Sequence, residues 1–271
     1  MLNLMEKDIR ILNIAGYLIK ISFLKPESAK TRSNFIRMAD SVFNGFLVKP
    51  TYKTIKSDFF IDIKPTANNL FLNGSKNAFV KLYDTSDNSD RITSFYSVSI
   101  DQFQLILMQV LFVLLANRGS VVHCSVINFH DQAILFLGKS GAGKSTAADL
   151  LSDEYEVLAD DDGIIKTEKG KYYFYQSPNS EKNESIKKTG KRYLVKAVFL
   201  LKKSKMYKAV KIVNKEFMFK QLTHQLLGDL KKPDKKIEFL FQLVNNFASF
   251  YLLFFGKDKI RLKRLIDNEL F

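Results

Sequence analysis

The residues whose types and spacing could do chemistry lie in one stretch near the middle of the chain. Residues 138–145 read G-x-x-x-x-G-K-S, the Walker A phosphate-loop pattern. In such a loop, glycines let backbone N–H groups converge on phosphate oxygens, the lysine reaches the β- and γ-phosphates, and the serine hydroxyl faces Mg²⁺. The pattern predicts nucleotide binding by the whole loop and the residue after it: Gly138, Lys139, Ser140, Gly141, Ala142, Gly143, Lys144, Ser145 and Thr146.

The residues on either side of the loop suit the strand–loop–helix context that this motif requires. Residues 133–137 form a short apolar run, which predicts a buried strand ending at Gly138. Residues 145–151 combine helix formers with an apolar face, so a helix should follow and point its positive N-terminus at the bound anion. The alternative is a glycine-rich turn that matches the pattern by chance.

Three consecutive aspartates, Asp160, Asp161 and Asp162, follow the short apolar run 156–159. The acidic partner of a phosphate loop usually lies at the end of a neighbouring strand. Adjacent carboxylates repel one another, so a cation between them is favoured, and one of them could instead accept the proton of an acceptor hydroxyl. We expect this metal or base role, against the alternative of an aspartate-rich surface turn.

The histidines and the single cysteine do not form a metal cluster. His123 lies in an apolar stretch ahead of the loop, a setting typical of a core histidine. His130 and His224 are expected in a loop and on a helix, with nothing that indicates a site. Cys124 also lies in an apolar run, which predicts an inert buried thiol. A zinc site is therefore not expected.

The composition bounds the size of the core and the kind of partner. The 271 residues are 46% hydrophobic, which suffices for one or two domains. Lys and Arg number 42 against 28 Asp and Glu, a net charge of +14, which indicates an acidic partner or, alternatively, a composition bias with solvated lysines. Nucleic acid is not expected, because aromatic residues are not interleaved with Lys and Arg.

The sequence predicts neither a signal peptide nor a membrane span. The N-terminus lacks a charged segment followed by a long apolar one. The longest apolar run, residues 105–116, is shorter than the roughly 20 residues that a spanning helix needs, so it predicts a buried helix. A single cysteine allows no intrachain disulfide, which is consistent with the expected cytoplasmic location.

We expect two regions, a small β-rich module over residues 1–99 and a core over residues 100–271. In the module, the patterns predict one helix at residues 33–46 and strands at residues 8–24, 59–63, 70–72, 77–83 and 91–98. In the core, they predict helices at residues 101–117, 217–230, 237–248 and 259–270, the first of them capped by Gly119. Core strands are expected at residues 121–129, 133–137, 156–159, 164–165, 172–175, 195–201, 208–213 and 250–255. The polar residues 177–192 are expected to form a mobile loop.

The order of these features resembles the HPr kinase/phosphorylase family and its smaller relatives, which share a phosphoenolpyruvate-carboxykinase type of nucleotide-binding core. The matching residues are His123, residues 138–145 and Ala159-Asp160-Asp161, and the resemblance covers about residues 100–201. It implies an α/β (α+β) fold, with a mixed-sheet phosphate-loop core and a small N-terminal β-rich module.

The resemblance also implies the chemistry. ATP and Mg²⁺ would be the cofactors, and the chain would be a serine kinase acting on a protein or peptide. Asp160 or Asp161 would remove the serine proton, with His123 beside that carboxylate and Lys144 holding the phosphate charge. Ser145 and Asp161 would bind the metal. Ser177, Pro178 and Lys182 are similar to residues of the smaller kinases.

One family feature is absent, and it leaves the acceptor open. HPr kinases carry an arginine-containing signature of the R-G-L-G type, whereas the corresponding residues here are 187–192, K-K-T-G-K-R. HPr as the substrate and phosphorylase activity are therefore not implied. The alternative function is a nucleotide-binding regulatory NTPase or switch without an acceptor. Whether the acceptor is acidic and whether the chain forms a homo-oligomer are also open.

Overall fold

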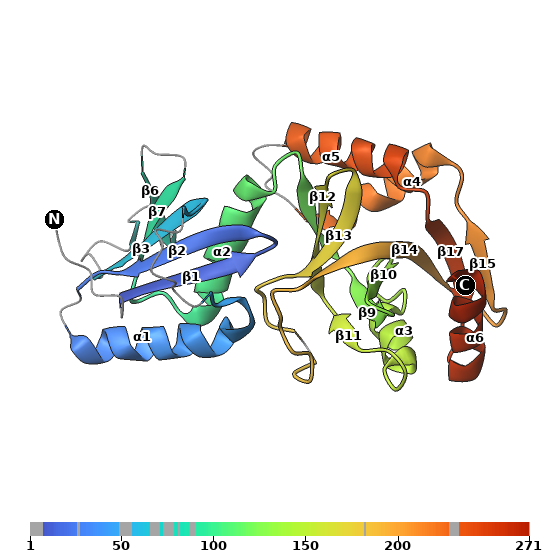
Figure 1. Cartoon of the computed structure of the whole chain (residues 1–271), viewed down its shortest axis with the longest axis horizontal. Coiled ribbons are helices and arrows are strands. Elements are labelled where there is room, and N and C mark those ends of the chain that lie inside the picture. Colours follow the sequence, from blue (N-terminus) through green and yellow to red (C-terminus); the bar gives the residue numbers. More distant parts are fainter. Residues whose placement is uncertain are drawn as a thin grey trace. The chain divides into compact units, whose positions relative to one another are not determined.

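The computed structural model describes residues 8–25, 28–48, 56–65, 71–72, 79–80, 82–86, 90–181, 183–227 and 233–270. Lys182 and parts of the strands expected at residues 70–72 and 77–83 lie outside these residues. The chain forms two compact units, Met1–Leu114 with Lys188–Gly190, and Leu115–Lys187 with Lys191–Phe271 (Figure 1). The first unit therefore includes the helix that the sequence analysis assigns to the core.

Unit 1 is built on a five-stranded mixed sheet with the order β1-β2-β3-β7-β6. Strand β3 is parallel to both of its neighbours, and the outer pairs are antiparallel. Strands β4 and β5 form a separate two-stranded sheet. The strands of the unit are β1 (Ile9–Ile14), β2 (Tyr17–Phe23), β3 (Phe59–Lys64), β4 (Phe71–Leu72), β5 (Phe79–Val80), β6 (Tyr83–Thr85) and β7 (Arg91–Phe95).

The helices of unit 1 pack through aromatic residues. Helix α1 (Ala29–Val42) is followed by the 3-10 turn η2 (Asn44–Phe46), so the single helix expected over residues 33–46 starts earlier and ends sooner. The ring of Phe35 on α1 meets the ring of Phe103 on α2 (Ile100–Leu114) edge to face, with centroids 5.6 Å apart. Such pairs stabilise a core beyond the area that they bury.

The predicted cap after α2 is wrong in its position. Asn117 has the left-handed backbone conformation (φ 66°), whereas Gly119 is the first residue of strand β8. A Cβ on Gly119 would lie 2.7 Å from the carbonyl oxygen of Ile165 on the neighbouring strand. The glycine is therefore explained by the close approach of two strands.

Unit 2 contains a ten-stranded mixed sheet that runs β11-β9-β10-β14-β13-β12-β8-β16, with β17 beside β14 and β15 beside β17. The long strand β14 pairs with β13 near its start and with β17 over its second half, while β10 lies along its other side. The strands are β8 (Gly119–His123), β9 (Ser125–Phe129), β10 (Gln132–Leu137), β11 (Val157–Ala159), β12 (Asp162–Glu168), β13 (Lys171–Gln176), β14 (Arg192–Lys203), β15 (Lys208–Lys211), β16 (Leu226–Leu227) and β17 (Phe250–Phe255).

Helices cover both faces of this sheet (Figure 1). Because side chains alternate along a strand, Leu135 of β10 packs in the cluster that holds Met218 of α4 (Lys215–Thr223) and Phe239 of α5 (Pro233–Asn246). Its neighbour Phe136 packs on the other face with residues of α3 (Lys144–Leu151) and α6 (Lys259–Leu270). Burying a side chain of this size contributes about 1.5–3 kcal/mol to the free energy of folding. Strand β10 is therefore held in place by packing on both of its faces.

Two of the three C-terminal helices differ from the expectation, and α5 starts at Pro233 and ends at Asn246 rather than covering residues 237–248. Asn214 caps α4, since its side chain accepts a hydrogen bond of 2.8 Å from the N–H of Phe217. The helix expected over residues 217–230 ends at Thr223, and β16 follows it. The helix at Lys259–Leu270 has the predicted bounds, and β17 does as well.

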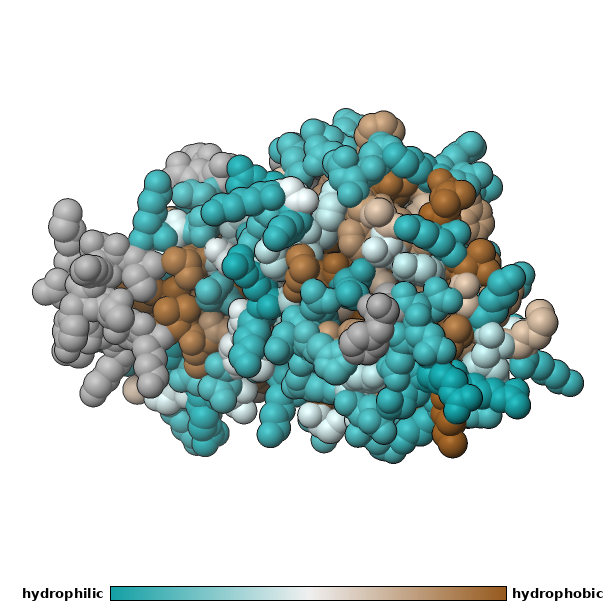
Figure 2. All heavy atoms as spheres, turned by 45° about the vertical axis from the view of Figure 1, so that its right-hand side comes forward, coloured by the Kyte–Doolittle hydropathy of each residue, from teal (hydrophilic) through white to brown (hydrophobic). Residues whose placement is uncertain are grey.

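The surface agrees with the charged composition. Hydrophilic residues cover most of the face drawn in Figure 2, with smaller groups of apolar residues between them. Among the described residues, no helix is both long and apolar enough to span a bilayer.

Candidate nucleotide and metal site

The phosphate loop connects β10 to α3, in the strand–loop–helix arrangement that its pattern requires. Gly143, the residue before the helix, has a left-handed backbone (φ 99°) that other residues rarely adopt. A Cβ on Gly138 would lie 2.7 Å from the Cβ of Ala142, so the loop closes tightly on itself. These two positions explain why glycine is needed at both ends of the motif.

The functional side chains of the loop differ in exposure. Lys144 is buried, and its Nζ donates a hydrogen bond of 3.0 Å to the carbonyl oxygen of Gly138, across the mouth of the loop. Ser145, on the first turn of α3, is exposed, as are Lys139 and Ser140. The N–H of Ala142 donates to the carbonyl oxygen of Lys139 at 3.0 Å. The hydroxyl of Ser145 is therefore accessible to a ligand.

Strand register brings the aspartates to the loop. In the antiparallel pair β9–β10, Ser125 lies opposite Phe136, two residues before Gly138. The Oγ of Ser125 donates a hydrogen bond of 2.7 Å to Oδ1 of Asp160. The carboxylate of Asp160 is thus held at the sheet edge from which the phosphate loop leaves.

The aspartates lie at a junction where two segments of the chain both change the strands with which they pair. Strands β8 and β9 are interrupted at Cys124, so that β8 pairs with β12 whereas β9 pairs with β10 and β11. The N–H of Cys124 donates to the carbonyl oxygen of Asp161 at 3.0 Å, which ties the two junctions to each other. The single strand expected over residues 121–129 is wrong for this reason, and Asp162 belongs to β12 rather than to a turn.

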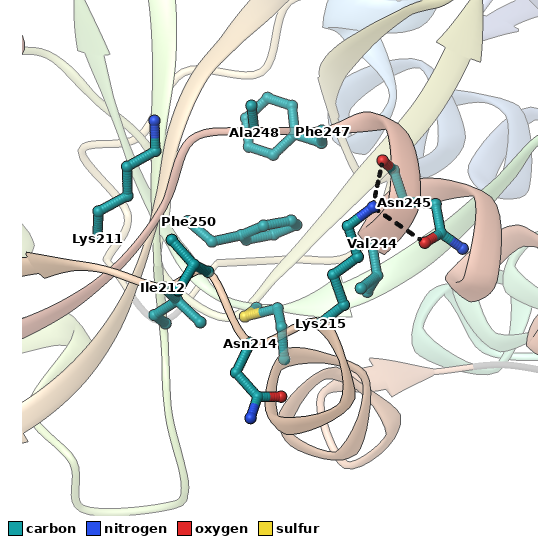
Figure 3. A pocket seen from close by; sticks show the side chains of 11 residues that line it. Lys211, Ile212, Asn214, Lys215, Val244, Asn245, Phe247, Ala248 and Phe250 are labelled. Atoms are coloured by element: carbon teal, nitrogen blue, oxygen red, sulfur yellow. Dashed lines mark hydrogen bonds between the residues drawn. The ribbon is translucent and has the colours of Figure 1, made fainter.

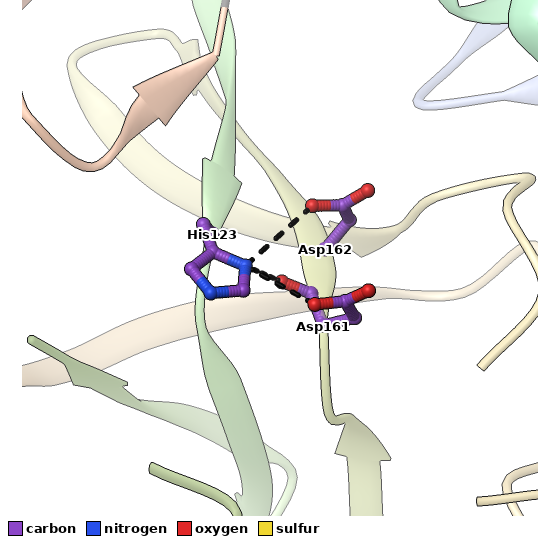
Figure 4. A group of neighbouring side chains, drawn as sticks. All are labelled: His123, Asp161 and Asp162. Atoms are coloured by element: carbon purple, nitrogen blue, oxygen red, sulfur yellow. Dashed lines mark hydrogen bonds and ion pairs between the residues drawn. The ribbon is translucent and has the colours of Figure 1, made fainter. Parts of the chain in front are cut away.

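The three aspartates have different surroundings. Asp160 contacts Ser125, whereas Asp161 and Asp162 both lie on the Nδ1 side of the His123 ring (Figure 4). The Nδ1 of His123 is 3.2 Å from Oδ1 of Asp161 and 4.0 Å from Oδ1 of Asp162. One ligand atom from each of these three residues fits within 4.8 Å, so together they could hold a cation.

The contacts of His123 define its tautomer. Its Nδ1 lies 2.8 Å from the backbone carbonyl oxygen of Asp161, which can only accept a hydrogen bond. The nearby carboxylate oxygen is also an acceptor, so Nδ1 must carry the proton. The histidine that would be a core residue by its sequence setting is half-buried and paired with an aspartate.

Three further residues orient the aspartates, and the sequence patterns did not indicate them as a group. Ser125 is the first of them, through its hydrogen bond to Asp160. The carboxylate of Glu181 accepts a hydrogen bond of 2.8 Å from the N–H of Asp160, and Nδ2 of Asn179 donates one of 2.8 Å to Asp162. Glu181 and Asn179 belong to the polar segment after Ser177, for which the sequence analysis expects a mobile loop. Apart from Arg192, which begins β14, that segment has no helix or strand among its described residues, and it contacts the aspartates directly.

The pKa shifts at the site reflect burial and a local excess of carboxylates. Burial raises the pKa of Asp149 on α3, and the charge of Asp160 adds to this shift. Asp160 therefore acts electrostatically on the helix that begins at Lys144. Burial raises the pKa of Cys124 well above its usual range, and the charges of Asp162 and Glu181 raise it further. The Cys124 thiol stays protonated and is not a nucleophile.

The residues present suit a magnesium ion. Mg²⁺ prefers oxygen ligands, and the carboxylates of Asp161 and Asp162 lie close enough together to offer them. The left-handed glycine and the exposed Ser145 hydroxyl leave the loop open to a phosphate group. Zinc is less well suited, because the cluster around His123 offers one nitrogen and otherwise carboxylate oxygens.

A separate hollow lies at α4 and α5, on the other face of the sheet from α3 (Figure 3). Its volume is about 310 Å³, and Met218, Val244 and Phe250 form an apolar floor. Lys215 at its rim donates hydrogen bonds of 3.3 Å to the backbone and side-chain oxygens of Asn245. None of the described residues that line it carries a carboxylate, so it offers neither a base nor a magnesium ligand.

Known proteins are similar in sequence to parts of this chain. A protein-family model described as SynChlorMet cassette protein ScmC matches residues 91–219. An HPr kinase/phosphorylase from Mycoplasmopsis pulmonis (strain UAB CTIP) is 30% identical over 108 residues, which are 40% of this chain and 35% of that protein. The chain thus matches about a third of the length of that curated relative.

A solved structure also matches. The Hpr(Ser) kinase/phosphatase from Coxiella burnetii aligns with a TM-score of 0.32 and 14% sequence identity, over 55% of this chain and 95% of that chain. The fold of the chain is mixed α/β, and over the matched residues it is similar in sequence to an HPr kinase/phosphorylase. The residues matched by the family model include His123, the phosphate loop and the aspartates.

Proposed function

We propose that the chain is an ATP-dependent phosphotransferase related to HPr kinases, which transfers the terminal phosphate of ATP to a serine hydroxyl of a protein or peptide. The observation that carries the proposal is the juxtaposition at one sheet edge. The hydrogen bond from Ser125 to Asp160 holds a carboxylate beside the exit of the phosphate loop. A phosphate-binding loop facing an oriented carboxylate supports phosphoryl transfer better than nucleotide binding alone.

Each group has a role in this proposal. The loop N–H groups and Lys144 bind the phosphates, and the helix N-terminus of α3 adds a favourable field. The serine oxygen attacks the γ-phosphorus, the bond between that phosphorus and the bridging oxygen breaks, and ADP leaves. The serine proton passes to the carboxylate of Asp160 or Asp161. His123 orients Asp161 through its Nδ1 proton.

The metal would be held by Ser145 and Asp161, with Asp160 as a further oxygen ligand. Mg²⁺ bound there would neutralise charge on the phosphate oxygens. The protein itself positions the reactants, which is the main contribution that an enzyme makes to phosphoryl transfer. The similarity to HPr kinase/phosphorylase, limited to 40% of the chain, supports the reaction class and leaves the acceptor open.

The experiment that tests this proposal is incubation of the protein with Mg²⁺, γ-³²P-ATP and an extract of the source cells. We expect label on an acceptor protein or peptide and phosphoserine in its acid hydrolysate. The Lys144→Ala variant, which lacks the phosphate-binding ammonium group, is the matched control. Release of free phosphate without labelled acceptor would favour the alternative, a nucleotide-dependent regulatory NTPase. This alternative is retained because residues 187–192 lack the arginine-containing signature of HPr kinases.

A further inference from the structure

A second lysine lies beside the phosphate loop, on the flank away from the aspartates. In the sheet order β9-β10-β14, the aspartate junction lies on the β9 side of the loop strand and β14 lies on its other side. Strand β14 ends with Lys203. The Cε of Lys203 is 3.8 Å from the position that a Cβ on Gly143 would occupy. Its side chain therefore reaches the residue that precedes Lys144 and opens helix α3.

The backbone of Lys203 is fixed by its neighbours. Lys203 lies opposite Phe255 in the parallel pair β14–β17, and the N–H of Ser204 donates to the carbonyl oxygen of Phe255 at 2.8 Å. The ring of Phe255 reaches the same point from β17, with its Cζ 3.0 Å from the Cβ position of Gly143. On this flank, the loop thus has a wall made by one aromatic ring and one lysine.

The side chain of Lys203 carries a positive charge and is exposed. Among the described residues, its ammonium group has no hydrogen bond or ion pair. Its neighbour Lys202 points to the opposite face, as strand alternation requires, and its Nζ lies 5.5 Å from the ring centroid of Phe254. A fixed strand end that brings a lysine side chain beside a phosphate loop favours an anion there.

We propose that Lys203 is a second phosphate-contacting lysine, which binds the polyphosphate chain of the nucleotide from the flank opposite the aspartates. The inference rests on the proposed nucleotide binding. Its ligand class is a nucleoside di- or triphosphate, because a single phosphate is already met by Lys144 and the loop N–H groups. In phosphoryl transfer, Lys203 would stabilise the negative charge that grows on the ADP leaving group.

The test is titration calorimetry with Mg·ATP and Mg·ADP at several salt concentrations. The main variant is Lys203→Met, which keeps an unbranched apolar side chain over Gly143 and removes only the charge. We expect it to weaken both nucleotides about tenfold, as loss of one charge-assisted contact does. Lys203→Arg should remain within about threefold of the unmodified chain, since it keeps the charge. The matched control, Lys202→Met, should leave both affinities unchanged.

Salt dependence separates this role from a structural one. The slope of log Kd against log salt should be less steep in Lys203→Met than in the unmodified chain, while the thermal midpoint without nucleotide stays the same. Equal affinities and slopes for Lys203→Met and the unmodified chain would overturn the inference, as would equal losses in Lys202→Met. Nucleotide binding by the unmodified chain and by Lys144→Ala is also measured, to distinguish a failure of this inference from a failure of the proposed function. If the unmodified chain binds no nucleotide, both the proposed function and this inference fail; if it binds and only Lys144→Ala loses affinity, the inference alone fails.

Discussion

Ser125 distinguishes the positioning of the carboxylate from the binding of nucleotide. Its hydroxyl is buried and donates to Asp160, whereas no atom of the phosphate loop depends on it in the described contacts. We predict that Ser125→Ala lowers the rate of phosphate transfer about tenfold. Without this hydrogen bond the base is less well oriented, and the transition state loses stabilisation equal to about the energy of one hydrogen bond. Affinity for Mg·ATP should be nearly unchanged. Initial transfer rates and calorimetric titrations measure the two quantities.

A second buried serine provides the control for this prediction. Ser120 lies on β8, and its Oγ donates a hydrogen bond of 3.1 Å to the carbonyl oxygen of Val121. Ser120→Ala should leave both transfer and nucleotide affinity unaltered. Similar transfer by Ser125→Ala and the unmodified chain would show that the contact with Asp160 has no part in the reaction.

At this scale, the sequence indicated the groups that bear chemistry but not their supports. The phosphate loop is recognisable because its residues are contiguous in the chain, and the aspartates because three carboxylates are adjacent. Ser125, Glu181 and Lys203 have no such local signal. Each reaches the site through strand register or a loop contact between residues far apart in the chain, and a single sequence does not specify these.

Among the elements, the β12–β13 hairpin carries a charged network that makes its stability depend on pH. Glu168 accepts hydrogen bonds of 2.6 Å from the Tyr175 hydroxyl and 2.7 Å from Arg192, and Lys166 lies 3.2 Å away. Burial alone raises the pKa of Glu168, but the contacts from Tyr175, Lys166 and Arg192 outweigh it, and the pKa is lowered from 4.5. Since the folded pKa is below the unfolded one, this stabilisation is present above about pH 4.5 and is lost as the pH falls through the folded pKa.

We predict that Glu168→Gln lowers the free energy of unfolding at pH 7 by about 1–2 kcal/mol, because it weakens a partly buried charged network. The difference from the unmodified chain should shrink as the pH is lowered below about 4.5. Urea unfolding at a series of pH values measures it. Glu184 is exposed, so Glu184→Gln should show no such trend. A difference between Glu168→Gln and the unmodified chain that grew on acidification would contradict this account.

The elements show where sequence patterns succeed. The sequence patterns predicted closely the bounds of the strand and helix around the phosphate loop, of β17 and of α6. Each of these elements is a single periodic run of residues that packs on one neighbour or on one pair of neighbours. The break at Cys124 was missed, since the apolar run continues through it and only the change of pairing partner interrupts the strand. The end of α4 at Thr223 was also missed, because Leu226 and Leu227 continue an apolar pattern but pair with β8.

On the scale of the whole molecule, the candidate site lies within unit 2. Every residue assigned to it belongs to the stretches Leu115–Lys187 or Lys191–Phe271. We predict that Mg·ATP increases the protection of backbone amides from hydrogen exchange in the loop between β10 and α3 and at the junction between β11 and β12. Strands β1 to β3 of unit 1 should exchange at the same rate with and without nucleotide.

Hydrogen exchange followed by mass spectrometry measures this distribution. The Lys144→Ala variant with Mg·ATP is the control, and it should show the exchange pattern of the nucleotide-free chain. Protection that appeared in unit 1 while the loop between β10 and α3 stayed unprotected would place the nucleotide elsewhere.

The most direct test of the central claim separates nucleotide binding from phosphate transfer in Asp160→Asn and Asp161→Asn. Both changes keep the shape of the side chain and remove its charge, so each variant should bind Mg·ATP within about tenfold of the unmodified chain. We predict that transfer from γ-³²P-ATP to the acceptor is lost in the variant that lacks the base and reduced at least a hundredfold in the other. Unaltered transfer in both variants would contradict the assignment of these aspartates and of the site built around them.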